Sequence, residues 1–474
     1  MRALFTTRLG AGIACALLAA GAAWAAPPPP RQSLAIEHVS VVPMTPDGVV
    51  LRDCTVVIRD GRIVSIAPSA GARPPPDTKR IPGAGKWLMP GLTDAHVHLE
   101  NDRLLRLYTR DPSVTDGALD PEDIFLPYIA NGVLQVFDLS AMSETVGQKS
   151  EIESGRLLGP HIALAAMIDG SPPLWPVGMT RVAATPADGR QAVRDARAEG
   201  YELIKVYSNL DLPTFSAIVD EARKLEMRVV GHIPQRGKGI TEKFFQPGYG
   251  MVAHAEEFAQ QTDVPDETAI PRYVAMARAN GTWLTATLTL DERLLEETAH
   301  PDTLNSRPEL RFVAPRLYSI VTEHNPYVAR ASRNQIDYLG RIVAFNARLT
   351  HAFIEAGVPV LAGTDTPVPG LVAGFALHDE LEALVRAGMT NRQALEASTR
   401  LPTEWLGVDG DRGVVAVGKR ADLLLLDADP LVDVANTRRI SAVIMGGRYL
   451  SRETLDRRMS ELASRYERAR KGPK

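Results

Sequence analysis

Short apolar runs alternate with amphipathic segments through the middle of the chain. Between residues 88 and 400 eight runs are apolar enough to be buried strands, and helix-like segments separate them. Alternating strands and helices are typical of a parallel sheet, so eight repeats predict an α/β fold with a closed (β/α)8 TIM barrel. The runs are WLMPGLTDAHVH, NGVLQVFDL, HIALAAMI, ELIKVYSN, MRVVGHIP, MVAHAEEF, TWLTATLTL and VPVLAGTD.

Both ends of the chain carry short β-type runs instead. Residues 33–66 contain three of them, with an Asp60-Gly61 turn signal between the second and the third, and residues 413–450 repeat this character. The two half-sets predict one small β-sandwich domain formed by both chain ends. The predicted domains are 26–88 and 406–451 for the two parts of the sandwich and 89–405 for the barrel.

Two further segments do not fit these patterns. Residues 291–345 are polar with helical patches and exceed what a barrel repeat needs, so we expect a lid over the barrel mouth. Residues 452–474 are strongly charged and predict one amphipathic helix, which we expect to be solvated on the surface.

Composition and charge narrow the class of protein. The 474 residues are 45% apolar and 23% charged, which is typical of a soluble globular protein. The net charge of −4 argues against a nucleic-acid binder that relies on bulk positive charge. Two cysteines, Cys15 and Cys54, are too few for a disulfide framework.

The first 25 residues have the layout of an export signal. Arg2 and Arg8 precede an apolar run that ends in Ala23-Trp24-Ala25, which predicts a secretory signal peptide cleaved near Ala25. The alternative, a membrane anchor, is disfavoured because the run is shorter than the ~20 residues of a spanning helix. We therefore expect a periplasmic or secreted protein with no stable membrane insertion after cleavage.

Ionisable residues occur within the apolar runs or at their ends, where burial is costly. His96 and His98 are two residues apart at the end of the first run, so both imidazoles share one strand face and can hold one metal. Lys205 shares its strand face with Leu203 and Tyr207, pointing into the barrel or against the helix layer. A buried lysine loses its proton readily, so Lys205 is a candidate for chemistry or modification.

Three more such residues follow at strand ends. His232, His254 and Asp365 each close an apolar run, at the barrel edge where catalytic residues gather. Imidazoles and carboxylates suit zinc or a similar divalent metal, and six ligating side chains suggest two metal ions. An amine would bridge two cations poorly. A modification that gives Lys205 oxygen donors would allow it to act as a ligand together with the other five residues.

A set of motifs between about residues 35 and 450 is highly specific. It comprises MPGLTDAHVHL at 89–99, GYELIKVYSN at 200–209, VVGHIP, the strand-end His254, VLAGTD, LHDELEALVRAGMTNRQALEASTRLPTEWLG at 377–407 and GVVAVGKRADLLLLDADPL at 413–431. In these motifs the sequence resembles the metal-dependent amidohydrolase superfamily, nearest its imidazolonepropionase-like and Xaa-Pro dipeptidase-like branch. The fold that this resemblance implies is similar to the barrel and sandwich predicted above.

The resemblance also implies a metal centre with two divalent ions, zinc being the expected metal. Lys205 would be carboxylated by carbon dioxide to N6-carboxylysine, and its carbamate would bridge both ions. The other ligands would be His96, His98 and Asp365 for the buried ion and His232 and His254 for the more exposed one.

The implied activity is hydrolysis of an amide bond in a small molecule, a Xaa-Pro-like dipeptide or an N-acyl amino acid. Asp365 would take the proton from the metal-bridging hydroxide as it attacks and pass it to the leaving amine. Tyr207 and His378 are candidate substrate contacts. Core packing is the alternative for Tyr207, and a helix-packing or capping role is the alternative for His378.

Other activities stay open at this point. A mononuclear imidazolonepropionase-like hydrolase or deaminase is one, although similar deaminases carry a glutamate where this chain has Gln235. An esterase, lactonase or organophosphate hydrolase would use the same binuclear site. A binding protein without chemistry is disfavoured because all six expected ligands are present.

The role of the segment around Glu256 and the oligomeric state both stay open. VAHAEEF departs from the IEHG-like sequence of relatives, so Glu256 and Glu257 either orient His254 or lie in a solvated loop. Homo-oligomers are common among similar proteins, but no segment of this chain identifies an interface.

Overall fold

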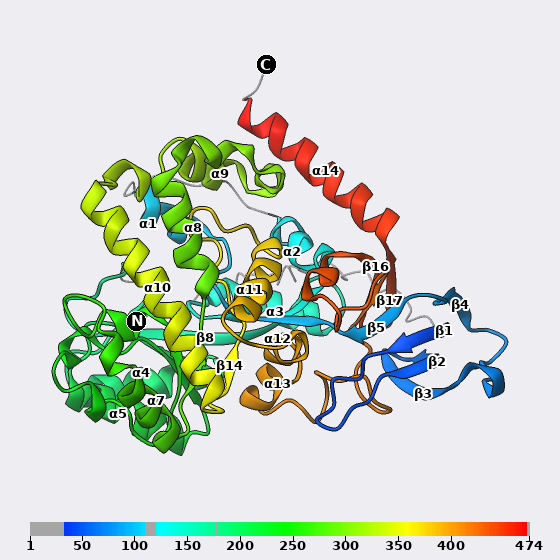
Figure 1. Ribbon diagram of the computed structural model, residues 1–474, viewed down its shortest axis with the longest axis horizontal. Helices are drawn as coiled ribbons and strands as arrows, with labels where there is room; N and C mark the ends of the chain where they lie inside the picture. The colour runs from blue at the N-terminus through cyan, green and yellow to red at the C-terminus, as the bar shows by residue number, and fades with distance from the viewer. Residues whose placement is uncertain (1–32, 110–119, 177, 472–474) are drawn as a thin grey trace, which may run out of the picture.

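The computed structural model describes residues 33–109, 120–176 and 178–471 (Figure 1). The predicted signal peptide, residues 1–25, lies outside the described residues. Among the residues that are described, no helix is both long enough and apolar enough to cross a membrane.

Eight parallel strands form the predicted barrel, in the order β14-β13-β12-β11-β10-β8-β7-β6. The barrel closes because the amide of Ala95 donates to the carbonyl of Ala362 at 3.0 Å, and that of His98 to Thr366 at 2.7 Å. The eight predicted repeats are therefore confirmed. The strands are β6 (Leu92–Val97), β7 (Val133–Asp138), β8 (His161–Asp169), β10 (Leu203–Val206), β11 (Arg228–Gly231), β12 (Tyr249–Ala253), β13 (Trp283–Thr285) and β14 (Val360–Leu361), with β9 (Arg181–Val182) beside β8.

Inward-facing side chains fill the barrel. Small residues such as Ala95 and Ala165 alternate with larger ones, and their cluster continues to Trp405. The Trp405 indole lies 5.8 Å from the Phe137 ring and donates to the carbonyl of Gly250 at 3.3 Å, next to the start of β12. Trp405 thus plugs the amino-terminal end of the barrel, which leaves the carboxyl-terminal end for chemistry.

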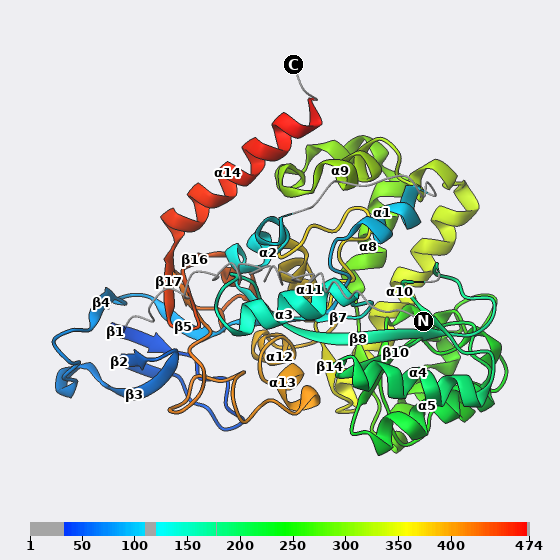
Figure 2. The same ribbon diagram turned by 180° about the vertical axis from the view of Figure 1, so that it is seen from behind.

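Helices cover the outside of the barrel (Figures 1 and 2). Many follow the strands directly, as the sequence pattern predicts. The helices are α1 (Asp102–Thr109), α2 (Pro121–Ala130), α3 (Ser143–Glu153), α4 (Pro186–Ala198), α5 (Leu212–Lys224), α6 (Glu256–Ala259), α7 (Ile270–Asn280), α8 (Leu288–Ala299), α9 (Pro315–Thr322), α10 (Arg333–Glu355), α11 (Phe375–Arg386), α12 (Asn391–Ala397), α13 (Arg400–Leu406) and α14 (Arg452–Arg470), with short 3-10 turns that include η6 (Pro308–Phe312) and η8 (Val434–Arg438).

A second, mixed sheet contains strands from both ends of the chain, as predicted. Its order is β17-β16-β15-β5-β1-β2-β3, with β4 parallel to β1. Asp60 and Gly61 both have positive φ, 51° and 75°, which suits the tight turn between β2 and β3. The strands are β1 (Leu34–Val41), β2 (Leu51–Arg59), β3 (Arg62–Pro68), β4 (Lys79–Pro82), β5 (Trp87–Pro90), β15 (Leu423–Leu426), β16 (Ile440–Met445) and β17 (Arg448–Ser451).

The first predicted barrel strand is in fact two strands in two sheets. β5 pairs with β1 and β15 in the mixed sheet, whereas β6 begins the barrel at Leu92. The chain changes sheet at Gly91, where a Cβ would lie only 2.5 Å from Cδ1 of Leu134. An apolar run does not reveal this break, because both of its halves are buried.

The C-terminal helix α14 is packed against the barrel rather than solvated all round. Its buried residues recur every three or four positions, and the helix contacts α2, α9 and η6. The buried face consists of Leu455, Met459, Leu462 and Tyr466.

Gly231 allows β10 and β11 to approach each other just before His232. Its φ is 145°, and a Cβ there would lie 2.1 Å from the carbonyl oxygen of Val206. Gly231→Ala should therefore lower the free energy of unfolding by about 3 kcal/mol, measured by urea denaturation. Gly340→Ala is the control, since nothing lies within 4 Å of that Cβ position in α10. Equal stability of the two variants would contradict this account.

Candidate metal centre

The six predicted ligands all come from the carboxyl-terminal half of a barrel strand or from the residues just after it. Lys205 lies on β10, and His96 lies near the end of β6. The other four follow their strands directly or within a few residues: His98, His232, His254 and Asp365. All six side chains are buried. The structure thus places each of them where a barrel positions catalytic residues.

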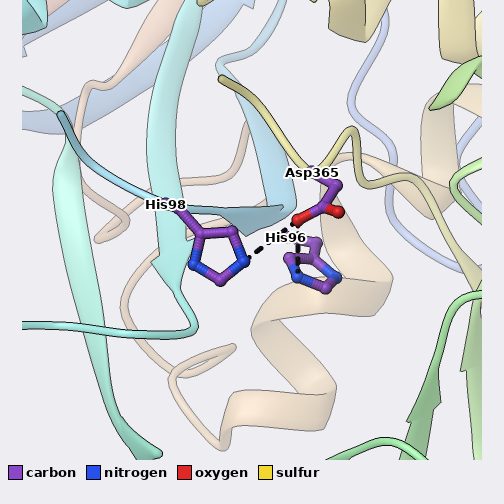
Figure 3. Close-up of side chains that lie close together, drawn as sticks. All are labelled: His96, His98 and Asp365. Carbon is purple, nitrogen blue, oxygen red and sulfur yellow. Dashed lines mark ion pairs between the residues drawn. The ribbon is translucent and has the colours of Figure 1, made fainter. Parts of the chain in front are cut away.

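His96, His98 and Asp365 form the tightest group (Figure 3). Oδ1 of Asp365 lies 3.1 Å from Nε2 of His96 and 3.0 Å from Nε2 of His98. One ligand atom from each residue falls within 4.8 Å of the others, as the three ligands of one metal ion would.

Lys205 points into the barrel toward this group. Its Nζ lies 3.4 Å from Nε2 of His96, and the side chain is only 1% exposed. Burial lowers the pKa of Lys205 to about 8, because an ammonium group loses its hydration there. A sizeable fraction of Lys205 is therefore a neutral amine near physiological pH.

His232 and His254 complete the ring of imidazoles. The His254 ring centroid lies 4.4 Å from that of His96 and 5.2 Å from that of His232. Nδ1 of His254 hydrogen-bonds with Oγ1 of Thr287 at 3.0 Å, and Nδ1 of His232 with Oγ of Ser208 at 2.9 Å. With Nδ1 occupied in this way, Nε2 of each ring remains available to bind a metal ion.

The protonation of the histidines also fits a metal ion. Burial, followed by the charge of Lys205, lowers the pKa of His96 to about 3. Burial likewise holds the pKa of His232 and of His254 well below its ordinary value. Neutral imidazoles are the ligating form, and Nδ1 of His96 is buried without a hydrogen-bond partner among the described residues. The donor set therefore suits a divalent cation such as zinc.

Asp94 is a positioning residue that the sequence analysis missed. It is fully buried, and its carboxylate accepts from the amide of His96 at 3.2 Å and from both N and Oγ1 of Thr364, at 3.0 and 2.7 Å. Asp94 thus links β6 to the loop that carries Asp365. Its place two residues before His96, on the same strand face, was the available signal.

Glu257 orients His232 and not His254, which corrects the expectation for this loop. Oε1 of Glu257 lies 2.8 Å from Nδ1 of His232, and Oε2 accepts from the amide of Ile233 at 3.0 Å. Glu257 is 1% exposed, so the solvated-loop alternative is wrong for this residue. Glu257 reaches His232 at the end of the neighbouring strand β11 because α6 begins shortly after β12.

Glu257→Gln should weaken metal binding by about 10-fold to 100-fold, because the amide orients His232 without raising its basicity. Competition with a chromophoric chelator measures the metal affinity. Glu267→Gln is the matched control, since Glu267 pairs with Arg348 on the surface. Unchanged affinity in Glu257→Gln would rule out this role.

Aromatic rings line the space beside the histidines. The Tyr207 ring centroid lies 4.1 Å from that of His232, and the Trp175 ring lies 5.1 Å from that of His98. Burial, with Asp365 next, raises the pKa of Tyr207 well above its ordinary value, so its hydroxyl stays protonated. Tyr207 is therefore next to the predicted ligands, as expected for a substrate contact.

His378 is not brought to this group. Its Nδ1 hydrogen-bonds with Oγ1 of Thr437 at 2.8 Å and its Nε2 with the carbonyl of Asn131 at 3.0 Å. Asn131 precedes β7 and so marks the opposite end of that strand from the histidines. Because both ring nitrogens are occupied there, the helix-packing alternative describes His378.

The sequence is similar to that of known proteins over most of its length. A model of the amidohydrolase family matches residues 160–450. An uncharacterized protein of Mycobacterium tuberculosis is 26% identical over 407 residues, which cover 82% of this chain and 90% of that protein.

Solved structures show the same fold over most of the chain. A proposed prolidase from Bifidobacterium longum is 25% identical, with a TM-score of 0.69 over 92% of this chain and 100% of that one. A Xaa-Pro dipeptidase with methionine bound in its active site is 18% identical, with a TM-score of 0.65 over 89% of this chain and 100% of that one.

Proposed function

Because the chain belongs to the amidohydrolase family, we propose that it is a binuclear metal-dependent hydrolase of an amide bond. The substrate class that we propose is a dipeptide of Xaa-Pro type or an N-acyl amino acid. Two structural neighbours support this choice. One is a Xaa-Pro dipeptidase with methionine bound in its active site, and the other is a prolidase complexed with N-methylphosphonate-L-proline.

One observation supports two metals over one. Lys205 reaches the group formed by His96, His98 and Asp365 from a separate strand, with Nζ 3.4 Å from Nε2 of His96. Burial disfavours the Lys205 ammonium more than the nearby carboxylates, Asp365 first, favour it. A carboxylated lysine would instead offer oxygen donors to two cations. His232 and His254 would hold the second ion.

Carboxylation of Lys205 needs only carbon dioxide. The lone pair of the neutral Nζ forms a bond to the carbon of carbon dioxide, and the nitrogen releases one proton, which leaves a carbamate anion. The lowered pKa of Lys205, about 8, supplies the neutral amine. The buried strand position supports a stable carbamate because it limits access of acid from solvent.

Divalent ions in this centre would polarise the scissile carbonyl and lower the pKa of water. The chain's own residues perform the remaining steps. Asp365 accepts the proton of the attacking water and passes it to the amine nitrogen as the C–N bond breaks. The Tyr207 hydroxyl donates a hydrogen bond to the substrate oxygen that gains negative charge.

A substrate screen with metal counting tests the proposal. Zinc-loaded mature protein with bicarbonate is incubated with Xaa-Pro and other dipeptides and with N-acyl amino acids, and the released amine is measured. We expect turnover of at least one such amide and about two metal ions per chain by elemental analysis. One metal ion per chain would favour a mononuclear hydrolase or deaminase. Turnover of esters or lactones alone would contradict the amide assignment.

We also propose that the protein is exported, on the basis of residues 1–25. Mass spectrometry of the protein recovered from the periplasm or medium should give a mature N-terminus near Ala26. An intact Met1 in that fraction would contradict cleavage.

A further inference from the structure

A cavity lies between α14 and the flank of the barrel. Figures 1 and 2 show where α14 runs. Its volume is about 450 Å³, which is in the range of small-molecule sites. Residues of α2, η6, α11, η8 and α14 line it, and none of the six predicted metal ligands is among them. Asn131, at one side of the cavity, lies just before β7, at the opposite end of that strand from the histidines. This cavity is therefore distinct from the space beside the histidines.

One wall of the cavity is aromatic. Phe312 of η6 and Phe375 of α11 stack with ring centroids 5.6 Å apart and planes 10° apart. The guanidinium of Arg311 lies 4.7 Å from the Phe312 ring centroid. Met459 of α14 also lines the cavity and supplies a polarisable thioether. A planar apolar group can therefore be held by stacking and dispersion contacts.

The charges of the lining are nearly balanced, with one exception. Arg438 is held by two carboxylates of α11 at 2.6 and 2.9 Å, and Arg452 is paired with Asp456 at 2.8 Å. Arg311 has no carboxylate partner among the described residues and is exposed. The cavity therefore offers one unpaired positive charge, which suits one negative charge on a ligand.

We propose that this cavity binds a small aromatic monocarboxylate. The ring of the ligand lies against Phe312 and Phe375, and its carboxylate pairs with the Arg311 guanidinium, whose fork geometry matches two carboxylate oxygens. A dianion such as a phosphate monoester is disfavoured, because its second charge would face Asp456 without a cation of its own.

Benzoate is the probe for this proposal. Isothermal titration of the metal-loaded full-length protein with benzoate should show one bound molecule per chain, and benzoate should raise the melting temperature. Benzyl alcohol, which keeps the ring without the charge, should bind at least about 10-fold more weakly because it lacks the ion pair. Acetate, which keeps the charge without the ring, should also bind at least about 10-fold more weakly.

Two substitutions at the rim locate the site. Arg311→Ala should weaken benzoate binding by about 10-fold or more, because it removes the unpaired charge. Ser460→Trp should abolish binding by filling the cavity from the exposed side of α14. Arg457→Ala is the matched control, since Arg457 pairs with Glu461 on the exposed face of the same helix and does not line the cavity.

A metal centre can also bind carboxylates, so the two sites must be separated. His96→Ala disrupts the metal centre and should leave the benzoate affinity of the cavity unchanged. The proposal is overturned if benzoate does not bind, if Arg311→Ala and Ser460→Trp both bind it like the parent protein, or if His96→Ala removes binding. Because the readout is binding and not turnover, this result is independent of the proposed amide hydrolysis.

Discussion

Lys205→Ala should reduce kcat/KM for the amide substrate by about 10³-fold or more, because it removes several kcal/mol of transition-state stabilisation. The structural reason is the position of Nζ, 3.4 Å from Nε2 of His96 and inside the barrel. Without the proposed carbamate, the site would lack the oxygen donors for a second ion. Elemental analysis should then find about one metal ion or fewer per chain.

Two controls separate this effect from a general loss of folding. Lys149→Ala removes a lysine that pairs with Glu202 near the surface and should keep both turnover and metal content. Protein prepared in ¹³C-bicarbonate should show a carbamate carbon resonance that is absent in Lys205→Ala. A Lys205→Ala protein with full turnover and two metal ions would refute the bridging role.

Asp365→Asn should lower kcat by about 10²-fold to 10⁴-fold, with a much smaller change in KM. The amide is the same size as the carboxylate but cannot accept the proton from the attacking water. Asn also tolerates the positive φ of this position, 65°, so the loop should keep its conformation. Stopped assays for kcat and KM, with metal content measured on the same sample, check the prediction.

Asp53→Asn provides the matched control for this substitution. Asp53 also has positive φ, 48°, but it lies on β2 of the mixed sheet, beside His38. It should keep wild-type turnover and stability. If Asp365→Asn also retained wild-type kcat, Asp365 could not be the proton acceptor, and Glu256, whose pKa burial and then Glu257 raise to about 8, would be the next residue to test.

The strands that carry the predicted ligands could be identified from the sequence, whereas the side-chain contacts of those ligands could not. The alternation of side chains in LIKVYSN puts Lys205 opposite Ile204 and Val206, which leaves only two places for its amine. The Lys205 amine points into the barrel interior, and that interior exists only because β14 and β6, which are far apart in the chain, close the sheet. The break at Gly91 could not be predicted either, because β5 and β6 on its two sides are both buried and therefore both apolar.

The side chains that position the ligands were harder to find. Glu257 lies close to His254 in sequence, yet it contacts His232, which is far more distant along the chain. Asp94 reaches Thr364 across 270 residues. Nothing in the sequence distinguishes these two acidic residues from surface ones. Their burial and hydrogen bonds in the folded chain show that they position neighbouring residues. His378 was instead a candidate that the structure removes. Its place after the last barrel strand suggested a substrate contact, but both of its ring nitrogens form hydrogen bonds away from the predicted ligands.

The sequence by itself determined the eight strand-and-helix repeats of the barrel, the shared sheet of the two chain ends and the six ionisable residues at or near strand ends, but not the break at Gly91. It did so because side-chain alternation and the cost of burying charge are local properties, visible in a short stretch of chain. The tertiary structure alone decided which imidazole nitrogens stay available, which acids orient them and how α14 lines a cavity beside the barrel. These features depend on contacts between segments that only folding brings within hydrogen-bond distance.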